Sequence, residues 1–152
     1  MKLSPHFTLA ELTASTKATV LGIDNTPPEE IIPRLILLAE MLERVRAFLG
    51  VPVIVSSGYR CPRLNTAVGG VTSSDHTQGH AGDIAAPKFG SAFVVASALA
   101  PKIADLGIGQ IIFENTKSSS WVHISNKVPT NQNSRILTFD GRNYAIGIKN
   151  LA

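Results

Sequence analysis

The stretch from Ser73 to Pro87 constrains the fold more than any other part of the chain, because it cannot form one regular helix. It places His76 and Asp83 seven residues apart, with two glycines between them, and a short apolar run follows Asp83 directly. Imidazole nitrogens and carboxylate oxygens are ordinary zinc ligands, and a catalytic zinc needs three protein ligands and one open position. The stretch therefore predicts two ligands of a zinc site built from a loop and a strand, unlike the single helix of His-Glu-x-x-His sites.

A third ligand has to come from another part of the chain, which contains four histidines in all. His123 lies in residues 119–125, where apolar and polar side chains alternate as in a strand. A strand that pairs with the one beginning at Asp83 would bring the two side chains together. His6 lies near the N-terminus, where chains often fray. The best set of three ligands is therefore His76, Asp83 and His123.

A candidate general base lies in residues 110–114, where an apolar run predicts a strand that ends in a carboxylate. A catalytic zinc lowers the pKa of its water to about 7, and a nearby carboxylate can take the proton of that water and pass it to a leaving amine. Glu114 would have this role if its strand pairs with the strand of His123. The alternative is a solvent-facing glutamate on an edge strand.

Four short motifs follow one another along the chain. They are Phe7-Thr8-Leu9-Ala10-Glu11-Leu12, the segment from Ser57 to Asn65, the pattern Ser74-x-His76-x-x-Gly79-x-Ala81-x-Asp83, and Trp121-x-His123. In this order, over residues 5 to 125, they resemble the zinc D,D-carboxypeptidase and L-alanyl-D-glutamate peptidase family of murein hydrolases. More narrowly, the chain is similar to the small, endolysin-like phage and prophage members of that family.

The resemblance implies a zinc metallopeptidase that cuts a peptide bond in peptidoglycan stem peptides or cross-links, of the D,D-carboxypeptidase or endopeptidase type. It implies that His76, Asp83 and His123 hold the zinc. Arg60 would grip a substrate carboxylate, because the family uses an arginine in the matching segment and a guanidinium can form two parallel hydrogen bonds to a carboxylate. Without the resemblance, Arg60 would be interpreted as a surface residue or as half of an ion pair.

Three further side chains are candidates for substrate binding. Ser74 lies two residues before His76, where a serine of the family often binds or orients substrate. Trp121 alternates with His123, which puts both on one face of their strand, so we expect a wall of the cleft, with core packing as the alternative. His80 lies where the family often has a variable polar residue. We expect His80 not to hold zinc and keep it as a candidate for substrate binding or acid–base chemistry.

One position departs from part of the family. Several of its enzymes carry the catalytic acid three residues before the last histidine ligand, and that position is Ser120 here. Either Glu114 reaches the site from a neighbouring strand, as in the subfamily's Gln-x-Ile-x-Glu pattern, or the protein is impaired in catalysis. The rival hypotheses are a non-catalytic zinc module that binds murein or belongs to a virion, and a metal-free binding protein on the same fold.

The remaining patterns predict one α+β domain over residues 1–152, with a central, mostly antiparallel sheet flanked by helices. The resemblance implies a fold of the Hedgehog and D-Ala-D-Ala peptidase type. A helix is expected over residues 25–49, which begin with a cap, prolines and acids and are followed by Gly50. Residues 13–24 are expected to be a polar connection. A turn at Asp140 and Gly141 predicts a hairpin, in which we expect no chemistry.

Composition favours some partners and excludes others. The net charge of +3 suits murein, whose stem peptides carry carboxylates, but the basic residues are scattered and form no stripe for nucleic acid. No apolar run is long enough to insert into a membrane, and the N-terminus lacks the apolar region of a signal peptide. We expect a monomer that is made in the cytoplasm without a signal peptide and acts on the cell wall or in the periplasm, with phage delivery as one route.

The single cysteine, Cys61, allows no internal disulfide and predicts a buried or half-buried thiol.

Overall fold

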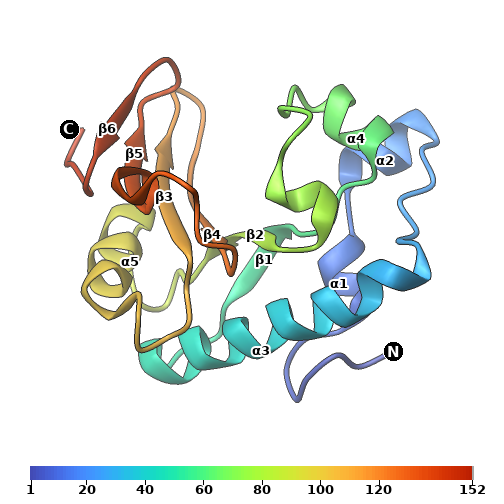
Figure 1. Ribbon diagram of the computed structural model, residues 1–152, viewed down its shortest axis with the longest axis horizontal. Coiled ribbons are helices and arrows are strands. Elements are labelled where there is room, and N and C mark those ends of the chain that lie inside the picture. The colour runs from blue at the N-terminus through green and yellow to red at the C-terminus, as the bar shows by residue number, and fades with distance from the viewer. Residues whose placement is uncertain (152) are drawn as a thin grey trace.

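One mixed sheet of six strands organises the computed structural model, which describes residues 1–151 (Figure 1). The strands are β1 (Ile54–Ser57), β2 (Ala81–Ala85), β3 (Gln110–Asn115), β4 (Ser120–Ser125), β5 (Ile136–Phe139) and β6 (Tyr144–Ile146). The helices are α1 (Leu9–Thr13), α2 (Thr16–Leu21), α3 (Ile32–Leu49), α4 (Pro62–Ala67) and α5 (Ala92–Leu99), and the short 3-10 turns are η1 (Glu29–Ile31), η2 (Asp75–Gln78), η3 (Ala100–Lys102) and η4 (Gln132–Ser134). The strand order is β1-β2-β4-β3-β5-β6, and only β3 and β5 pair in parallel. The predicted α+β class, with a mostly antiparallel sheet and flanking helices, is confirmed.

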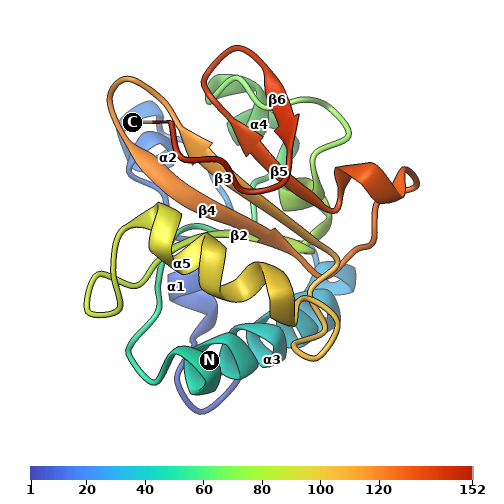
Figure 2. The same cartoon turned by 90° about the vertical axis from the view of Figure 1, so that its left-hand side faces the viewer.

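Successive side chains of the central strands point to opposite faces of the sheet, so that one face is apolar and the other carries polar side chains. One face packs against α3 and α5 in the main hydrophobic core (Figure 2). Its fully or nearly fully buried side chains are Ile84, Ile111, Phe113, Val122 and Ile124. The side chains between them point to the other face, which we call the open face. Asp83, Glu114 and His123 all lie there, so the pleat of three strands gathers the polar side chains on the side away from the core.

Helix α3 is the longest helix, and the sequence accounts for both of its ends. Pro33 lies in the first turn, where its missing N–H removes no helical hydrogen bond. Gly50 ends the helix in the left-handed conformation, at φ +70°, and its N–H bonds to the carbonyl of Arg46. The predicted helix is confirmed, although its α-helical part begins at Ile32, after η1. Within residues 1–151, neither α3 nor another helix combines the length and apolar character needed to cross a membrane.

The prediction of a polar connection over residues 13–24 is wrong, because this segment contains α2. The hydroxyl of Ser15 caps α2 by accepting a hydrogen bond of 3.1 Å from Ala18 N. Gly22 ends the helix with a φ of +64°, which favours glycine. Helix α2 is too short to show a periodic apolar pattern, so only these two end signals were available. Figure 1 shows α2 beside α4, at the far end of the sheet from β6.

The N-terminal segment is held to α3 by one carboxylate, that of Glu43. It accepts hydrogen bonds from Ser4 Oγ (2.7 Å) and from His6 N (2.7 Å), and its other oxygen lies 2.8 Å from His6 Nδ1. Burial opposes the ionisation of Glu43, but the bonds from Ser4 and His6 outweigh it and hold its pKa below the ordinary value. His6 therefore has a structural partner on the N-terminal side of the core.

Replacing Glu43 by Ala is expected to lower the free energy of unfolding by about 1–2 kcal/mol, because hydrogen bonds to a charged group are lost. Glu40→Ala is the matched control, since Glu40 is exposed on the same helix. Because the folded-state pKa of Glu43 is depressed, its contribution is complete above the unfolded pKa near 4.5 and is lost as the pH falls through the lower folded value. Urea unfolding at pH 7 and in acid measures both effects. Equal urea midpoints for Glu43→Ala and the control at pH 7 would contradict this role.

Candidate metal centre and active site

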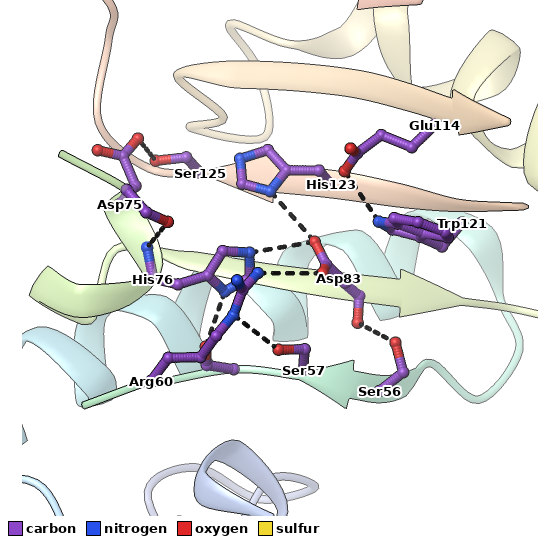
Figure 3. Close-up of polar contacts among 12 residues, drawn as sticks. Ser56, Ser57, Arg60, Asp75, His76, Asp83, Glu114, Trp121, His123 and Ser125 are labelled. Carbon is purple, nitrogen blue, oxygen red and sulfur yellow. Dashed lines mark hydrogen bonds and ion pairs between the residues drawn. The ribbon is translucent and has the colours of Figure 1, made fainter. Parts of the chain in front are cut away.

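Three side chains from three different elements converge on the open face (Figure 3). His76 comes from η2, Asp83 from β2 and His123 from β4. Asp83 and His123 lie opposite each other in the register of these antiparallel strands. Asp83 Oδ1 lies 3.2 Å from His76 Nε2 and 3.1 Å from His123 Nδ1, and one ligand atom from each residue lies within 4.8 Å of the others. The three residues predicted as ligands thus form one cluster, which we call the metal cluster.

The loop before β2 is shaped to present His76. Ser74 caps η2, and its hydroxyl accepts a hydrogen bond of 3.3 Å from the N–H of His76. Gly79 then reverses the chain from η2 into β2 with a φ of +76°, a conformation that L side chains rarely adopt. A Cβ at this position would also lie 3.0 Å from the side chain of Ile31. The glycine that breaks the helix in the sequence is therefore the residue that lets His76 and Asp83 face each other.

The hydrogen bonds of His76 fit a bound divalent metal. Its Nδ1 lies 2.7 Å from the carbonyl oxygen of Gly58, so this nitrogen carries a proton and donates it, which leaves Nε2 with a lone pair. His76 is buried, and its Nε2 faces Asp83 Oδ1 at 3.2 Å without making a well-formed hydrogen bond to any residue of 1–151. An imidazole nitrogen and a carboxylate oxygen that face each other in this way can share a metal cation. Two imidazoles and one carboxylate are a ligand set of catalytic zinc, so these residues fit that ion.

Asp83 and His123 shift each other's pKa values. Burial opposes the ionisation of Asp83, but in the site without metal the charge of a protonated His76 and the hydrogen bond from His123 outweigh it and hold the pKa of Asp83 below its ordinary value. Burial also opposes the protonation of His123, and the hydrogen bond and charge of Asp83 overcome it, so the pKa of His123 is raised. A metal cation that binds here takes the place of a proton. Metal affinity should therefore fall as the pH falls through the pKa of His123.

Glu114 lies next to the metal cluster on the neighbouring strand β3. It is opposite Trp121 in the pairing of β3 with β4, and Trp121 Nε1 donates a hydrogen bond of 2.8 Å to Glu114 Oε2 (Figure 3). Burial and the charge of Asp83 raise the pKa of Glu114 above its ordinary value. The charges of His123 and Arg60 and the hydrogen bond from Trp121 offset part of this rise. A carboxyl group with a raised pKa beside a metal site is suited to act as a general base.

Arg60 flanks the cluster from the opposite side, after the end of β1. Its Nη2 lies 3.7 Å from Asp83 Oδ2. Two further bonds, each of 3.2 Å, run from Nε to Ser57 Oγ and from Nη1 to Asn65 Oδ1. These contacts fix the guanidinium, so that a positive charge is held at the edge of the site beside an ionised ligand.

Two residues considered in the sequence lie outside the cluster. His80 lies with Asn126, whose Oδ1 is 3.1 Å from His80 Nδ1, and both line a small cavity against α3. His80 directly precedes β2. If the alternation of side chains along β2 is extended back to His80, this position falls on the core side of the sheet, with Ile84, and not on the open face. Ser120 is exposed at the start of β4, so the carboxylate beside the cluster comes from Glu114 on β3 and not from the strand of His123.

Two supporting contacts were missed in the sequence. Ser125 Oγ donates a hydrogen bond of 2.8 Å to Asp75 Oδ2 and so ties the end of β4 to η2, and the carbonyl of Gly58 orients His76. The charge of Asp75 also contributes to the raised pKa of His123. Only their positions in the sequence could have indicated these roles. Asp75 directly precedes the predicted ligand His76, and Ser125 lies two residues after His123, on the same face of the predicted strand.

A metal cluster with a carboxyl group of raised pKa and a fixed arginine on one sheet face is characteristic of metal-dependent hydrolases. The family model described as Peptidase M15 matches residues 5–125, and the chain therefore belongs to this family of zinc-dependent peptidases. A search of curated proteins gave no match. Family membership supports a metallopeptidase, and it supports zinc as the ion that His76, Asp83 and His123 could hold.

Proposed function

We propose that this protein hydrolyses a peptide bond in peptidoglycan stem peptides or their cross-links, as a D,D-carboxypeptidase or endopeptidase. One observation carries the proposal: Arg60 and Glu114 flank the metal cluster from opposite sides on the open face (Figure 3). A peptide lying across these strands would meet, in turn, a cation that binds carboxylates, a metal ion and a general base. Peptidoglycan stem peptides carry the carboxylates that such a site requires.

The reaction needs water to attack the carbonyl carbon and the C–N bond to break. Zinc, when bound, is a Lewis acid that polarises the carbonyl group and lowers the pKa of water. Glu114 would take a proton from the attacking water and give it to the leaving amine, so that it returns to its ionised form. The raised pKa of Glu114 favours its taking up that proton, and the bond from Trp121 holds the carboxylate in place.

Three other side chains would contact the substrate. Arg60 would bind a carboxylate through its guanidinium, which is held by Ser57 and Asn65. Ser74 is half-buried next to His76 and would contribute its hydroxyl. The indole of Trp121 would form a wall of the cleft beside Glu114.

A non-catalytic murein-binding or virion module on the same fold is the second candidate, because Ser120 stands where several relatives carry the catalytic acid. The half-buried position of Glu114 beside the cluster favours the enzyme, since a glutamate without chemistry would gain more from full hydration. In this proposal the protein acts as a monomer on the cell wall, and phage delivery is one route to that location.

Mass spectrometry of purified murein and of defined stem peptides tests the proposal. After incubation with the protein, a new carboxylate and a new amine should appear, and the masses of the products identify the bond that is cut. The products should be absent in the presence of a zinc chelator. Intact substrate after incubation with folded, zinc-loaded protein would favour the non-catalytic module.

Replacing Trp121 by Phe is expected to move the acid limb of the activity profile to higher pH. The indole N–H stabilises the ionised form of Glu114, so its loss raises the pKa of Glu114 further. A base must be ionised to accept a proton, so kcat/KM falls as the pH drops through this pKa. Both proteins are compared at equal zinc content, because the ion also affects the pKa. An acid limb at the same pH in both proteins would mean that Glu114 does not control it.

A further inference from the structure

We propose that Asp75 is a positioning residue of the metal cluster, and that it acts through Ser125 to hold His76 and His123 at the separation that one metal ion requires. This inference goes beyond the proposed function, because it concerns metal binding and does not depend on which bond the protein cuts. Neither Asp75 nor Ser125 is among the three clustered ligands, so any effect of theirs on the metal must act through a neighbour.

Asp75 and Ser125 lie next to the two histidine ligands. Asp75 directly precedes His76 in η2. Ser125 follows His123 by two residues, on the same face of β4. Ser125 is fully buried, and its hydroxyl donates the hydrogen bond of 2.8 Å to Asp75 Oδ2 (Figure 3). The same hydroxyl accepts a hydrogen bond of 3.1 Å from the N–H of Lys127, so the orientation of the Ser125 side chain is fixed.

The segment that carries His76 lies between glycines. The turn η2 is short, and Gly69 and Gly79 on either side of it have left-handed conformations, with φ of +79° and +76°. Glycine leaves the backbone more freedom than any other residue does. The hydrogen bond to the carbonyl of Gly58 fixes one edge of the His76 ring, toward the loop after β1. Asp75 supplies the connection in the other direction, toward β4.

Two backbone hydrogen bonds support this connection. Asn126 N donates a hydrogen bond of 3.0 Å to the carbonyl of His80, and His80 N donates one of 3.0 Å to the carbonyl of Asp75. Both bonds use main-chain atoms, so the substitution of a side chain leaves them in place. The carboxylate of Asp75 is therefore a part of the connection that a substitution can remove while the backbone path is kept.

The connection matters because the ligands of one zinc ion must lie close together. Zinc binds imidazole nitrogens at about 2.0–2.1 Å, so two nitrogens on one zinc lie within about 4 Å of each other. The rings of His76 and His123 meet edge to face, with centroids 5.1 Å apart. A displacement of η2 away from β4 would separate these rings and weaken zinc binding without removing a ligand.

The charge of Asp75 should favour a bound cation as well. None of the ion pairs within residues 1–151 includes Asp75, and its charge acts on the ligand His123. A carboxylate that no side-chain cation neutralises adds to the attraction for a metal ion beside it. The hydrogen bond and the charge can be separated by experiment, because asparagine keeps an oxygen that can accept the Ser125 hydroxyl and carries no charge.

Zinc affinity, measured by competition with a chromophoric chelator, tests this role. We expect Ser125→Ala and Asp75→Ala each to lower the affinity about 10- to 100-fold, as for other residues that orient a metal ligand. Asp75→Asn should lower it less than Asp75→Ala, because the hydrogen bond is kept. The protein with both alanines should lose little more than Asp75→Ala alone, because the two substitutions remove the same bond. The visible spectrum of the cobalt(II)-loaded protein, which depends on ligand geometry, should change in Ser125→Ala.

Thr138→Val is the matched control, because Thr138 carries another buried hydroxyl of the sheet. Its Oγ1 donates a hydrogen bond of 2.7 Å to the carbonyl of Gly147 and accepts one of 2.8 Å from Lys149 N. Thr138 lies on β5 and is not one of the clustered ligands. The loss of its hydroxyl should lower the urea midpoint of the metal-free protein and leave zinc affinity within about twofold of the wild type.

Urea midpoints of the metal-free proteins show whether each variant is folded. If Asp75→Ala does not fold, Ser125→Ala and Asp75→Asn decide the matter. Zinc affinities of Ser125→Ala and Asp75→Asn that stay within twofold of the wild type would overturn the role, even if the urea midpoints fall. Losses that multiply in the double variant would also overturn it, because the two residues would then act independently. None of these measurements uses a substrate, so their outcome is separate from that of the proposed peptidase reaction.

Discussion

Replacing Glu114 by Gln is expected to lower kcat about 10²- to 10⁴-fold, which is the usual contribution of a general base. Glutamine has nearly the same shape and can still accept the hydrogen bond from Trp121, but it cannot take up a proton. Zinc content should stay at the wild-type level, because Glu114 is not one of the three clustered ligands. Steady-state kinetics on a cleaved stem peptide and metal analysis of the same sample measure the two quantities.

Glu40→Gln is the control for this substitution, because Glu40 is an exposed glutamate on α3, on the other face of the sheet. It should leave both kcat and zinc content unchanged. A Glu114→Gln protein with wild-type kcat would contradict the role of Glu114 as the general base. The position of Ser120 would then become the first explanation to pursue for any weak activity.

Replacing His123 by Ala is expected to lower zinc affinity by more than about 100-fold. Loss of a residue that only orients a ligand costs about 10- to 100-fold, and loss of a ligand should cost more. Competition with a chromophoric chelator measures the affinity directly. Because a ligand that binds only the folded state stabilises it, removal of zinc should lower the Tm of the wild-type protein and leave that of His123→Ala nearly unchanged.

His80→Ala is the matched control for the ligand variant. His80 pairs with Asn126 away from the cluster, so its removal should leave zinc affinity within about twofold of the wild type. Zinc binding that depends on His80 and not on His123 would contradict the ligand set.

The central part of the site could be predicted because it depends on local patterns. Gly79 marks the end of η2, and the alternation in residues 119–125 predicts which side chains share a face with His123. Antiparallel pairing then places His123 opposite Asp83. The residue types that bind metals and the alternation of side chains along a strand can both be recognised in a short stretch of sequence. The convergence of the three residues could therefore be predicted from the sequence.

Other features depend on contacts that no local pattern encodes. The carbonyl of Gly58 that orients His76 could have been any nearby backbone group, and the bond between Ser125 and Asp75 joins residues that are adjacent only after folding. Helix α2 was missed because it is too short for helical periodicity to appear. The parallel pairing of β3 with β5 is a further example, because the turn of a hairpin does not by itself predict which strand the hairpin will join.

Zinc titration of the metal-free protein, with amine release from a stem peptide followed at each step, tests the central claim most directly. We expect no release before zinc is added, a linear increase in rate up to one equivalent of zinc, and no further increase beyond it. A protein that is folded, binds one equivalent of zinc and still releases no amine from any stem peptide would contradict the peptidase. Release that proceeds at full rate without zinc would contradict the role of the metal cluster.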